Sequence, residues 1–179
     1  RLYGVPESFY SINGSSGAIL AAVSAAVDKG GQILVARNCH KAVYHAIYLR
    51  ELSATYIYPH EDPKLGINGG ISAERVERYL EENPDVQAFL LTSPTYDGIV
   101  SDIKAIAEVV HRHEIPLIVD EAHGAHFNFS DYFPESAVTL GADVVIQSTH
   151  KTLPAMTQTA LIHLNGALID HERIRRMLT

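Results

Sequence analysis

The sequence predicts an α/β domain with a mainly parallel sheet and helices on both faces, a three-layer arrangement. Short apolar, β-branched runs alternate with longer segments of helical period along the 179 residues, and this alternation is typical of strand-helix-strand units. Hydrophobic residues make up 46% of the chain and charged residues 20%, which is ordinary for one soluble globular domain. No internal repeat or low-complexity tract interrupts the pattern.

Apolar runs that are rich in β-branched residues are predicted to be strands. They are Gln32–Ala36, Thr55–Tyr58, Val86–Leu91, Leu117–Val119, Val144–Gln147 and Thr159–Leu164. Pro84 and Pro116 stand just before two of these runs, where a helix cannot continue. The run that ends before Asp120 has no polar residue and is therefore predicted to be buried.

Segments of helical period lie between the strands. The clearest are Ala18–Val27, Lys41–Leu52, Ala73–Glu82 and Ile103–Arg112, and His171 to Leu178 is also helix-like. Ser72 provides an N-cap for the third of these helices. Gly30-Gly31 is expected to close the first helix, and Asn68-Gly69-Gly70 marks a turn.

Charge and cysteine content narrow the function classes. The formal net charge is −7, whereas proteins that bind nucleic acid concentrate Lys and Arg. Cys39 is the only cysteine and cannot form an intramolecular disulfide, so we expect a cytoplasmic protein. No apolar run approaches the roughly 20 residues that span a bilayer. We therefore expect neither a nucleic acid nor a membrane as a partner.

Polar residues follow the strand at 144–147, and in open α/β sheets ligands gather at the carboxyl ends of strands. The residues are Ser148, Thr149, His150 and Lys151. A lysine that forms a Schiff base must lose its proton near neutral pH, which partial burial and nearby cationic groups favour. Ser148 and Thr149 could donate hydrogen bonds to a phosphate beside that amine. A solvated lysine is the alternative, and this segment alone does not decide between the two.

Asp120 ends another predicted strand and is followed by Glu121, Ala122 and His123. An aspartate in this position can keep a pyridinium nitrogen protonated, and Ala122 would leave room for a flat ring. A metal site is the alternative, because Asp120, Glu121, His123 and His126 are all suitable ligands. We expect no metal, since the His-x-x-His spacing is a weak signal outside a helix.

Two further segments have the residues of a binding site. Asn13-Gly14-Ser15-Ser16-Gly17 leads into the first helix, where glycines and free N–H groups favour an anion such as phosphate. His40 follows the strand at 32–36, and its flat imidazole can stack on a cofactor ring. Helix capping is the alternative explanation for both segments.

Together these segments resemble the ornithine/lysine/arginine decarboxylase family, a branch of the aspartate-aminotransferase-type fold that binds pyridoxal 5'-phosphate (PLP). The match covers nearly the whole chain. The strings that carry it are Asn13-Gly14-Ser15-Ser16-Gly17, Arg37-Asn38-Cys39-His40-Lys41, Ser93-Pro94-Thr95-Tyr96-Asp97-Gly98, Asp120-Glu121-Ala122-His123-Gly124-Ala125-His126 and Ser148-Thr149-His150-Lys151-Thr152-Leu153-Pro154-Ala155-Met156.

The resemblance implies a role for each matching position. Lys151 would form the Schiff base with PLP, and Asp120 would pair with its pyridine nitrogen. His40 would stack on one face of the ring, opposite Ala122. Four positions would hold the phosphate: Ser15, Ser16, Ser148 and His150. Ser93 or Thr95, together with His123, would lie near the phenolic oxygen.

The resemblance also implies a function, a lyase reaction in which arginine, lysine or ornithine is decarboxylated to an amine of polyamine biosynthesis. Another PLP-dependent reaction on the same fold, or a non-catalytic PLP-fold module, stays open. Ser93-Pro94 stands where aminotransferases often carry Asn-Pro, which speaks against a plain aminotransferase. The resemblance further implies a homodimer or higher homo-oligomer. We expect residues 1–179 to be the PLP-binding large domain of a longer enzyme, without its small C-terminal domain, and to be weakly active or inactive alone.

Overall fold

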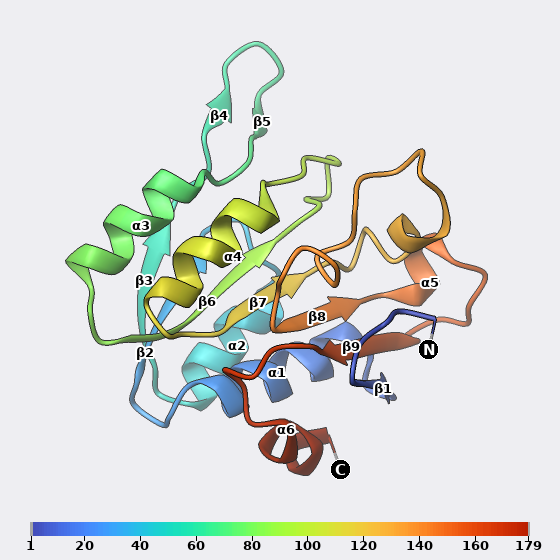
Figure 1. Cartoon of the computed structure of the whole chain (residues 1–179), viewed down its shortest axis with the longest axis horizontal. Coiled ribbons are helices and arrows are strands. Elements are labelled where there is room, and N and C mark those ends of the chain that lie inside the picture. The colour runs from blue at the N-terminus through green and yellow to red at the C-terminus, as the bar shows by residue number, and fades with distance from the viewer. Residues whose placement is uncertain (1, 179) are drawn as a thin grey trace.

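A seven-stranded sheet forms the middle of the molecule in the computed structural model, which describes residues 2–178 (Figure 1). The strand order is β1-β9-β8-β7-β6-β2-β3. In chain order the strands are β1 (Glu7–Ser11), β2 (Gln32–Ala36), β3 (Ser53–Ile57), β6 (Val86–Thr92), β7 (Leu117–Asp120), β8 (Val144–Gln147) and β9 (Ala160–Leu164). The strands from β3 to β8 in this order are parallel, whereas β9 runs antiparallel to β8 and to β1.

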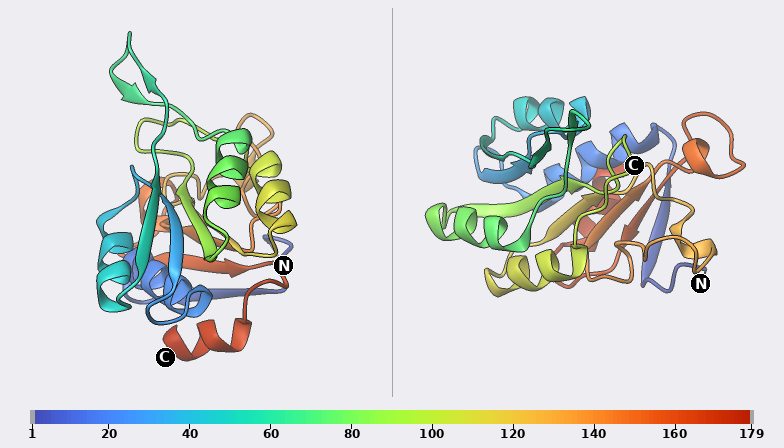
Figure 2. Two further views of the ribbon diagram at one scale, coloured as in Figure 1. Left: turned by 90° about the vertical axis from the view of Figure 1, so that its left-hand side faces the viewer. Right: turned by 90° about the horizontal axis from the view of Figure 1, so that it is seen from above.

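Helices cover both faces of the sheet (Figure 2). One face packs against α1 (Gly14–Ala26), α2 (Lys41–Leu49) and α6 (His171–Leu178), and the other against α3 (Ala73–Glu82) and α4 (Ile103–Arg112). Successive side chains of a strand point to opposite faces, so Leu34 and Val35 of β2 belong to different apolar clusters. None of the described helices is long and apolar enough to cross a membrane.

The predicted fold class is confirmed, and the six predicted strands are all present within a few residues. The sheet is mixed at one edge because the predicted strand at 159–164 runs antiparallel as β9. Residues 148–159 contain only the four-residue helix α5 (Thr149–Thr152), whereas a parallel return usually needs a crossover helix that runs back along the sheet. Strand β1 was not predicted. Its residues alternate in burial on an edge strand and form no apolar run.

Several predicted boundaries differ from those of the structure. Helix α1 starts at Gly14 and ends at Ala26, before the predicted glycine stop. The helix predicted over 41–52 ends at Leu49, and Glu51 adopts a positive φ of 57°, a conformation that a helix cannot continue through. The turn predicted at Asn68-Gly69-Gly70 is wrong, because Asn68 is the last residue of strand β5 (Ile67–Asn68). The turn lies at residues 63–66, where it closes a small hairpin of β4 (Glu61–Asp62) and β5 that projects from the body of the domain (Figure 1).

Candidate cofactor site

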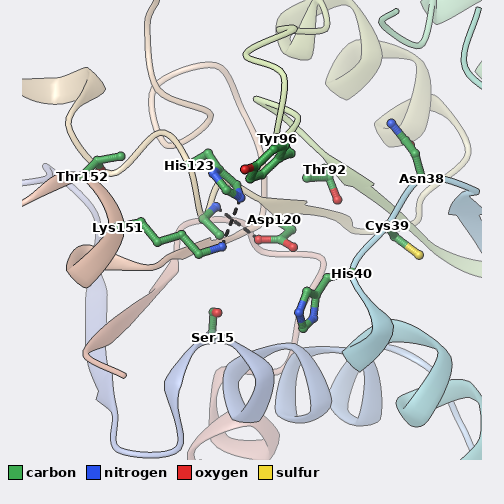
Figure 3. Close-up of a pocket in the computed structure, with 11 residues that line it drawn as sticks. Ser15, Asn38, Cys39, His40, Thr92, Tyr96, Asp120, His123, Lys151 and Thr152 are labelled. Atoms are coloured by element: carbon green, nitrogen blue, oxygen red, sulfur yellow. Dashed lines mark hydrogen bonds between the residues drawn. The ribbon is translucent and has the colours of Figure 1, made fainter. Parts of the chain in front are cut away.

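A cavity of about 600 Å³ lies at the carboxyl ends of the parallel strands. It is open to the first turn of α1 and to α5, so elements from both halves of the sequence border it (Figure 3). The lining residues are Ser15, Asn38, Cys39, His40, Thr92, Tyr96, Asp120, Ala122, His123, Lys151 and Thr152. This is the edge at which ligands gather in open α/β sheets.

The amine of Lys151 lies beside an imidazole. Its Nζ is 3.1 Å from Nε2 of His123, and the His123 ring meets the ring of Tyr96 edge to face at 5.6 Å between centroids. Burial and the nearby Lys151 amine both lower the pKa of His123. A neutral imidazole has one nitrogen that can accept a hydrogen bond, so His123 Nε2 is in a position to accept one from Lys151 Nζ.

Asp120 is the last residue of β7 and is only 2% exposed. Its Oδ1 accepts a hydrogen bond from the Ala122 N–H at 3.2 Å. Burial raises the pKa of Asp120 to about 6, although the Ala122 N–H and the Lys151 charge act in the opposite direction. A buried carboxylate of this kind would be stabilised by a cationic N–H donor from the cavity.

The start of α1 places a hydroxyl at the cavity. Ser148 Oγ donates a hydrogen bond of 2.8 Å to Ser15 Oγ, which lies on the cavity wall. Gly14 adopts a φ of +67°, and a Cβ at this position would lie 3.3 Å from the Gln158 carbonyl oxygen. Glycine is therefore required at the start of the helix, where free backbone N–H groups favour an anion.

His40 caps a helix and also borders the cavity. It is the N-cap of α2, and its Nδ1 accepts a hydrogen bond from the Ala42 N–H at 3.2 Å. The ring also borders the cavity together with Ala122. Burial is the main cause of a lowered His40 pKa, and Lys151 adds to it, so the neutral ring is favoured.

Five of the predicted binding residues do not line the cavity: Ser16, Ser93, Thr95, Ser148 and His150. Ser93 Oγ accepts from the Ser101 N–H, and Thr95 Oγ1 accepts from the Ile99 N–H, both at 3.1 Å. The His150 Nδ1 is 3.0 Å from the Thr159 carbonyl oxygen and donates to it. Ser148 is fully buried behind Ser15. The side chains of Ser93, Thr95 and His150 are therefore hydrogen-bonded to backbone groups around the cavity.

Several lining residues were not predicted, above all Thr92 and Asn38. Thr92 Oγ1 and Asn38 Oδ1 are buried and have no hydrogen-bond partner within residues 2–178. Thr92 pairs with Asp120 across β6 and β7; its position at a strand end was the available signal, but the strand was predicted to stop one residue earlier. Cys39 also borders the cavity, and burial raises its pKa to about 11, so the thiol stays protonated.

The residues of the alternative metal site are not assembled. His126 packs against the rings of Phe127 and Phe133 and does not border the cavity with Asp120 and His123. Within the described range 2–178, no three His, Cys, Asp or Glu side chains come close enough to hold a metal ion.

Known proteins resemble this chain over its whole length. The model of the "Orn/Lys/Arg decarboxylase, major domain" family matches residues 1–179. The uncharacterized protein YaaO of Bacillus subtilis is 41% identical over 99% of this chain and 37% of its own length. The arginine decarboxylase of the same species is 37% identical over 99% of this chain and 36% of its own length. The solved structure of lysine decarboxylase A from Pseudomonas aeruginosa has a TM-score of 0.83 at 26% identity, over 100% of this chain and 27% of that one.

The sheet and its covering helices are those of the large domain of the aspartate-aminotransferase-type enzymes, as the resemblance implied. Within that class, the chain belongs to the Orn/Lys/Arg decarboxylase family and matches its major domain. The chain spans a little over a third of the length of these two curated relatives.

Proposed function

We propose that the cavity binds PLP, held covalently through Nζ of Lys151, and that the protein decarboxylates a basic amino acid. The observation that carries this proposal is that the Lys151 amine and the buried Asp120 carboxylate face one cavity that also has an imidazole and a hydroxyl on its walls (Figure 3). Membership of the Orn/Lys/Arg decarboxylase family supports the reaction class.

The residues present fit the cofactor. Asp120 lacks a cationic partner at hydrogen-bond distance within residues 2–178, and a protonated ring nitrogen would provide one. Ser15 stands at the N-terminal end of a 13-residue helix, where a phosphate is stabilised by backbone N–H groups and the helix dipole. The unpartnered Oγ1 of Thr92 and Oδ1 of Asn38 offer further hydrogen bonds in the same cavity.

Each residue would have a definite task. PLP, when bound, supplies an electron-withdrawing ring that accepts the electron pair left by departing CO2. Asp120 would hold the proton at the ring nitrogen, and His123 would orient Lys151 Nζ by accepting a hydrogen bond from it. His40 and Ala122 would enclose the flat ring from opposite sides, and Ser15 would donate to the phosphate.

The domain organisation of the protein is part of this proposal. The curated relatives are more than twice as long as the segment that this chain matches. We therefore propose that residues 1–179 are the cofactor-binding domain of a longer enzyme, in which a further domain encloses the substrate. Excluding water and orienting the scissile carboxylate are the tasks that such a domain would perform.

Reduction with borohydride tests the attachment site. Full-length protein incubated with PLP and then reduced should carry the label on Lys151, as peptide mapping would show. Lys151→Ala should carry none, whereas Lys64→Ala, a change on the exposed β4–β5 hairpin, should be labelled like the wild type. Release of CO2 and an amine from arginine, lysine or ornithine would identify the reaction and its substrate. A label on another lysine, or products of transamination, would contradict the proposal.

A further inference from the structure

A second buried carboxylate lies directly beside Asp120 in the chain and has no task in the proposed reaction. Glu121 is 1% exposed. Its Oε1 accepts from the Ala137 N–H at 2.7 Å, and its Oε2 accepts from Ser136 Oγ at 2.7 Å and from Gln147 Nε2 at 2.6 Å. Three donors surround a group that can only accept when ionised, so this carboxylate is well satisfied although buried.

The Glu121 carboxylate sets the direction of a chain of hydrogen bonds. Because the Gln147 amide donates to Glu121, its Oε1 is left to accept, and it lies 3.1 Å from His163 Nε2. His163 is fully buried, and burial lowers its pKa to about 4, so the ring is neutral. A neutral ring that donates from Nε2 must accept at Nδ1, where Ser8 Oγ lies at 2.8 Å.

These three residues join the strands that carry the candidate site. Glu121 follows Asp120 at the end of β7, and its own N–H donates to the Ile146 carbonyl of β8 at 2.8 Å. Gln147 ends β8, just before the segment that holds Ser148 and Lys151. His163 lies on β9, and its ring is hydrogen-bonded to the side chain of Gln147. None of the three borders the cavity.

We propose that Glu121, Gln147 and His163 form a carboxyl-end clamp whose side-chain hydrogen bonds fix the position of Lys151 relative to Asp120. The inference rests on the proposed function, since the clamp matters only if both residues hold one cofactor. Glu121 and Gln147 are then positioning residues: they touch no substrate or cofactor, and they act through their chain neighbours. A displacement well below one ångström at such a site already matters for catalysis.

The donor pattern distinguishes two substitutions. Gln147→Leu keeps the side-chain volume but removes both the amide nitrogen and the amide oxygen, so it breaks the link between β7 and β9 at its centre. Glu121→Gln can remake the chain in reverse, because the new amide donates to a flipped Gln147, which donates to His163 Nε2, and His163 then donates from Nδ1 to Ser8. The first change breaks the clamp, whereas the second preserves it with the opposite polarity.

PLP titration of the full-length protein tests the clamp through the absorbance of the lysine-bound cofactor. For Gln147→Leu we expect the PLP dissociation constant to rise about tenfold and the pH midpoint of the absorbance change to move. Glu121→Gln should stay close to the wild type in both measurements, while ¹⁵N NMR should show the His163 proton moved from Nε2 to Nδ1.

Asp143→Asn is the matched control. Asp143 lies at the amino ends of β7 and β8, away from the cavity at their carboxyl ends. It accepts hydrogen bonds from His111 and from the Leu117 N–H. The substitution should lower the melting temperature and leave both cofactor measurements unchanged. If Gln147→Leu behaves like this control, or if Glu121→Gln is as impaired as Gln147→Leu, the clamp is refuted while the proposed function stands. A wild type without a lysine-bound chromophore would contradict the proposed function itself, and the clamp with it.

Discussion

The neighbouring strands β7 and β8 have one buried aspartate at their amino ends and one at their carboxyl ends. The two carboxylates differ in the hydrogen bonds that they accept. Asp143, at the amino ends, is 1% exposed, and its Oδ2 accepts from His111 Nε2 and from the Leu117 N–H, each at 2.8 Å. A Cβ at Gly166 would stand 1.5 Å from its Oδ1, so the group is tightly enclosed. Asp120, at the carboxyl ends, is 2% exposed and has one longer bond, from the Ala122 N–H at 3.2 Å.

The difference separates a structural carboxylate from a candidate functional one. A buried carboxylate with two close donors stabilises the fold around it, whereas one with a single longer hydrogen bond costs free energy until a ligand completes it. The protein therefore has a closed polar cluster at the amino ends of these strands and an open one at their carboxyl ends. We call the second the open edge of the sheet. Cofactor binding at the open edge would supply the missing partner of Asp120.

The largest expected effect is on turnover. It is measured by replacing each of the two aspartates, Asp120 and Asp143, with asparagine. Asp120→Asn in the full-length protein should still bind PLP but lose one to two orders of magnitude or more in kcat. The reason is that a neutral amide gives up a charge-assisted interaction of about 1.5–3 kcal/mol with the ring nitrogen. Asp143→Asn should keep kcat and lose about 1–3 kcal/mol of folding stability. Near-normal turnover of Asp120→Asn would remove the contrast between the two edges.

The next effect is the pH dependence of folding without cofactor. Burial raises the folded-state pKa of Asp120 from 3.8 to about 6, so the unfolded chain releases this proton first as the pH rises. Stability therefore falls between about pH 4 and pH 6, and the full cost, on the order of 3 kcal/mol, applies above pH 6. Urea denaturation should show that the free energy of unfolding of Asp120→Asn rises relative to that of the wild type as the pH increases across this window.

The comparison with the variant isolates Asp120 from His163, which acts in the opposite direction. The folded pKa of His163 is lowered to about 4, so its contribution is complete above the unfolded value near 6.5 and is lost as the pH falls towards 4. That loss is common to both proteins and cancels in the difference. A difference that does not change with pH would mean that Asp120 is already satisfied without cofactor.

The sequence was sufficient to predict the strands of the sheet centre and the residues that their ends deliver. Asp120 follows an apolar run directly, and His40 and Lys151 each stand four residues after the last residue of theirs, so their positions after the strands brought them to one edge. Ser93 and Thr95 show the limit of this reasoning. Their hydroxyls are used by the N–H groups of Ser101 and Ile99, and a loop's own hydrogen bonds cannot be read from residue types.

The clamp could not be predicted from the sequence, for a different reason. Gln147 and His163 were assigned to strands, but their pairing depends on β9 running antiparallel beside β8. The direction of that strand is decided by the short connection through α5, not by its apolar pattern. Glu121 was recognised only as a possible metal ligand within the segment after Asp120, because its three donors come from residues 15 to 26 positions away.

The smallest expected effect repeats the comparison on two adjacent residues, Thr92 and Ser93, at the end of β6. Thr92 Oγ1 is buried without a partner among residues 2–178, whereas Ser93 Oγ accepts from the Ser101 N–H. Thr92→Val keeps the side-chain shape and removes an unsatisfied hydroxyl, so the cofactor-free protein should gain about 1 kcal/mol of stability. Ser93→Ala leaves the Ser101 N–H without its acceptor and should lose about 1–2 kcal/mol.

Cofactor affinity should respond to these two changes in the opposite sense. Thr92 borders the cavity, so loss of its hydroxyl should weaken PLP binding about fivefold, whereas Ser93→Ala should bind PLP as the wild type does. Urea denaturation without cofactor and PLP titration of the same samples give both quantities. A Thr92→Val variant that is less stable than the wild type would show that the hydroxyl already has a partner, such as a bound water next to Asp120. The open edge would then be satisfied by solvent before the cofactor arrives, and displacing that water would become part of the cost of binding.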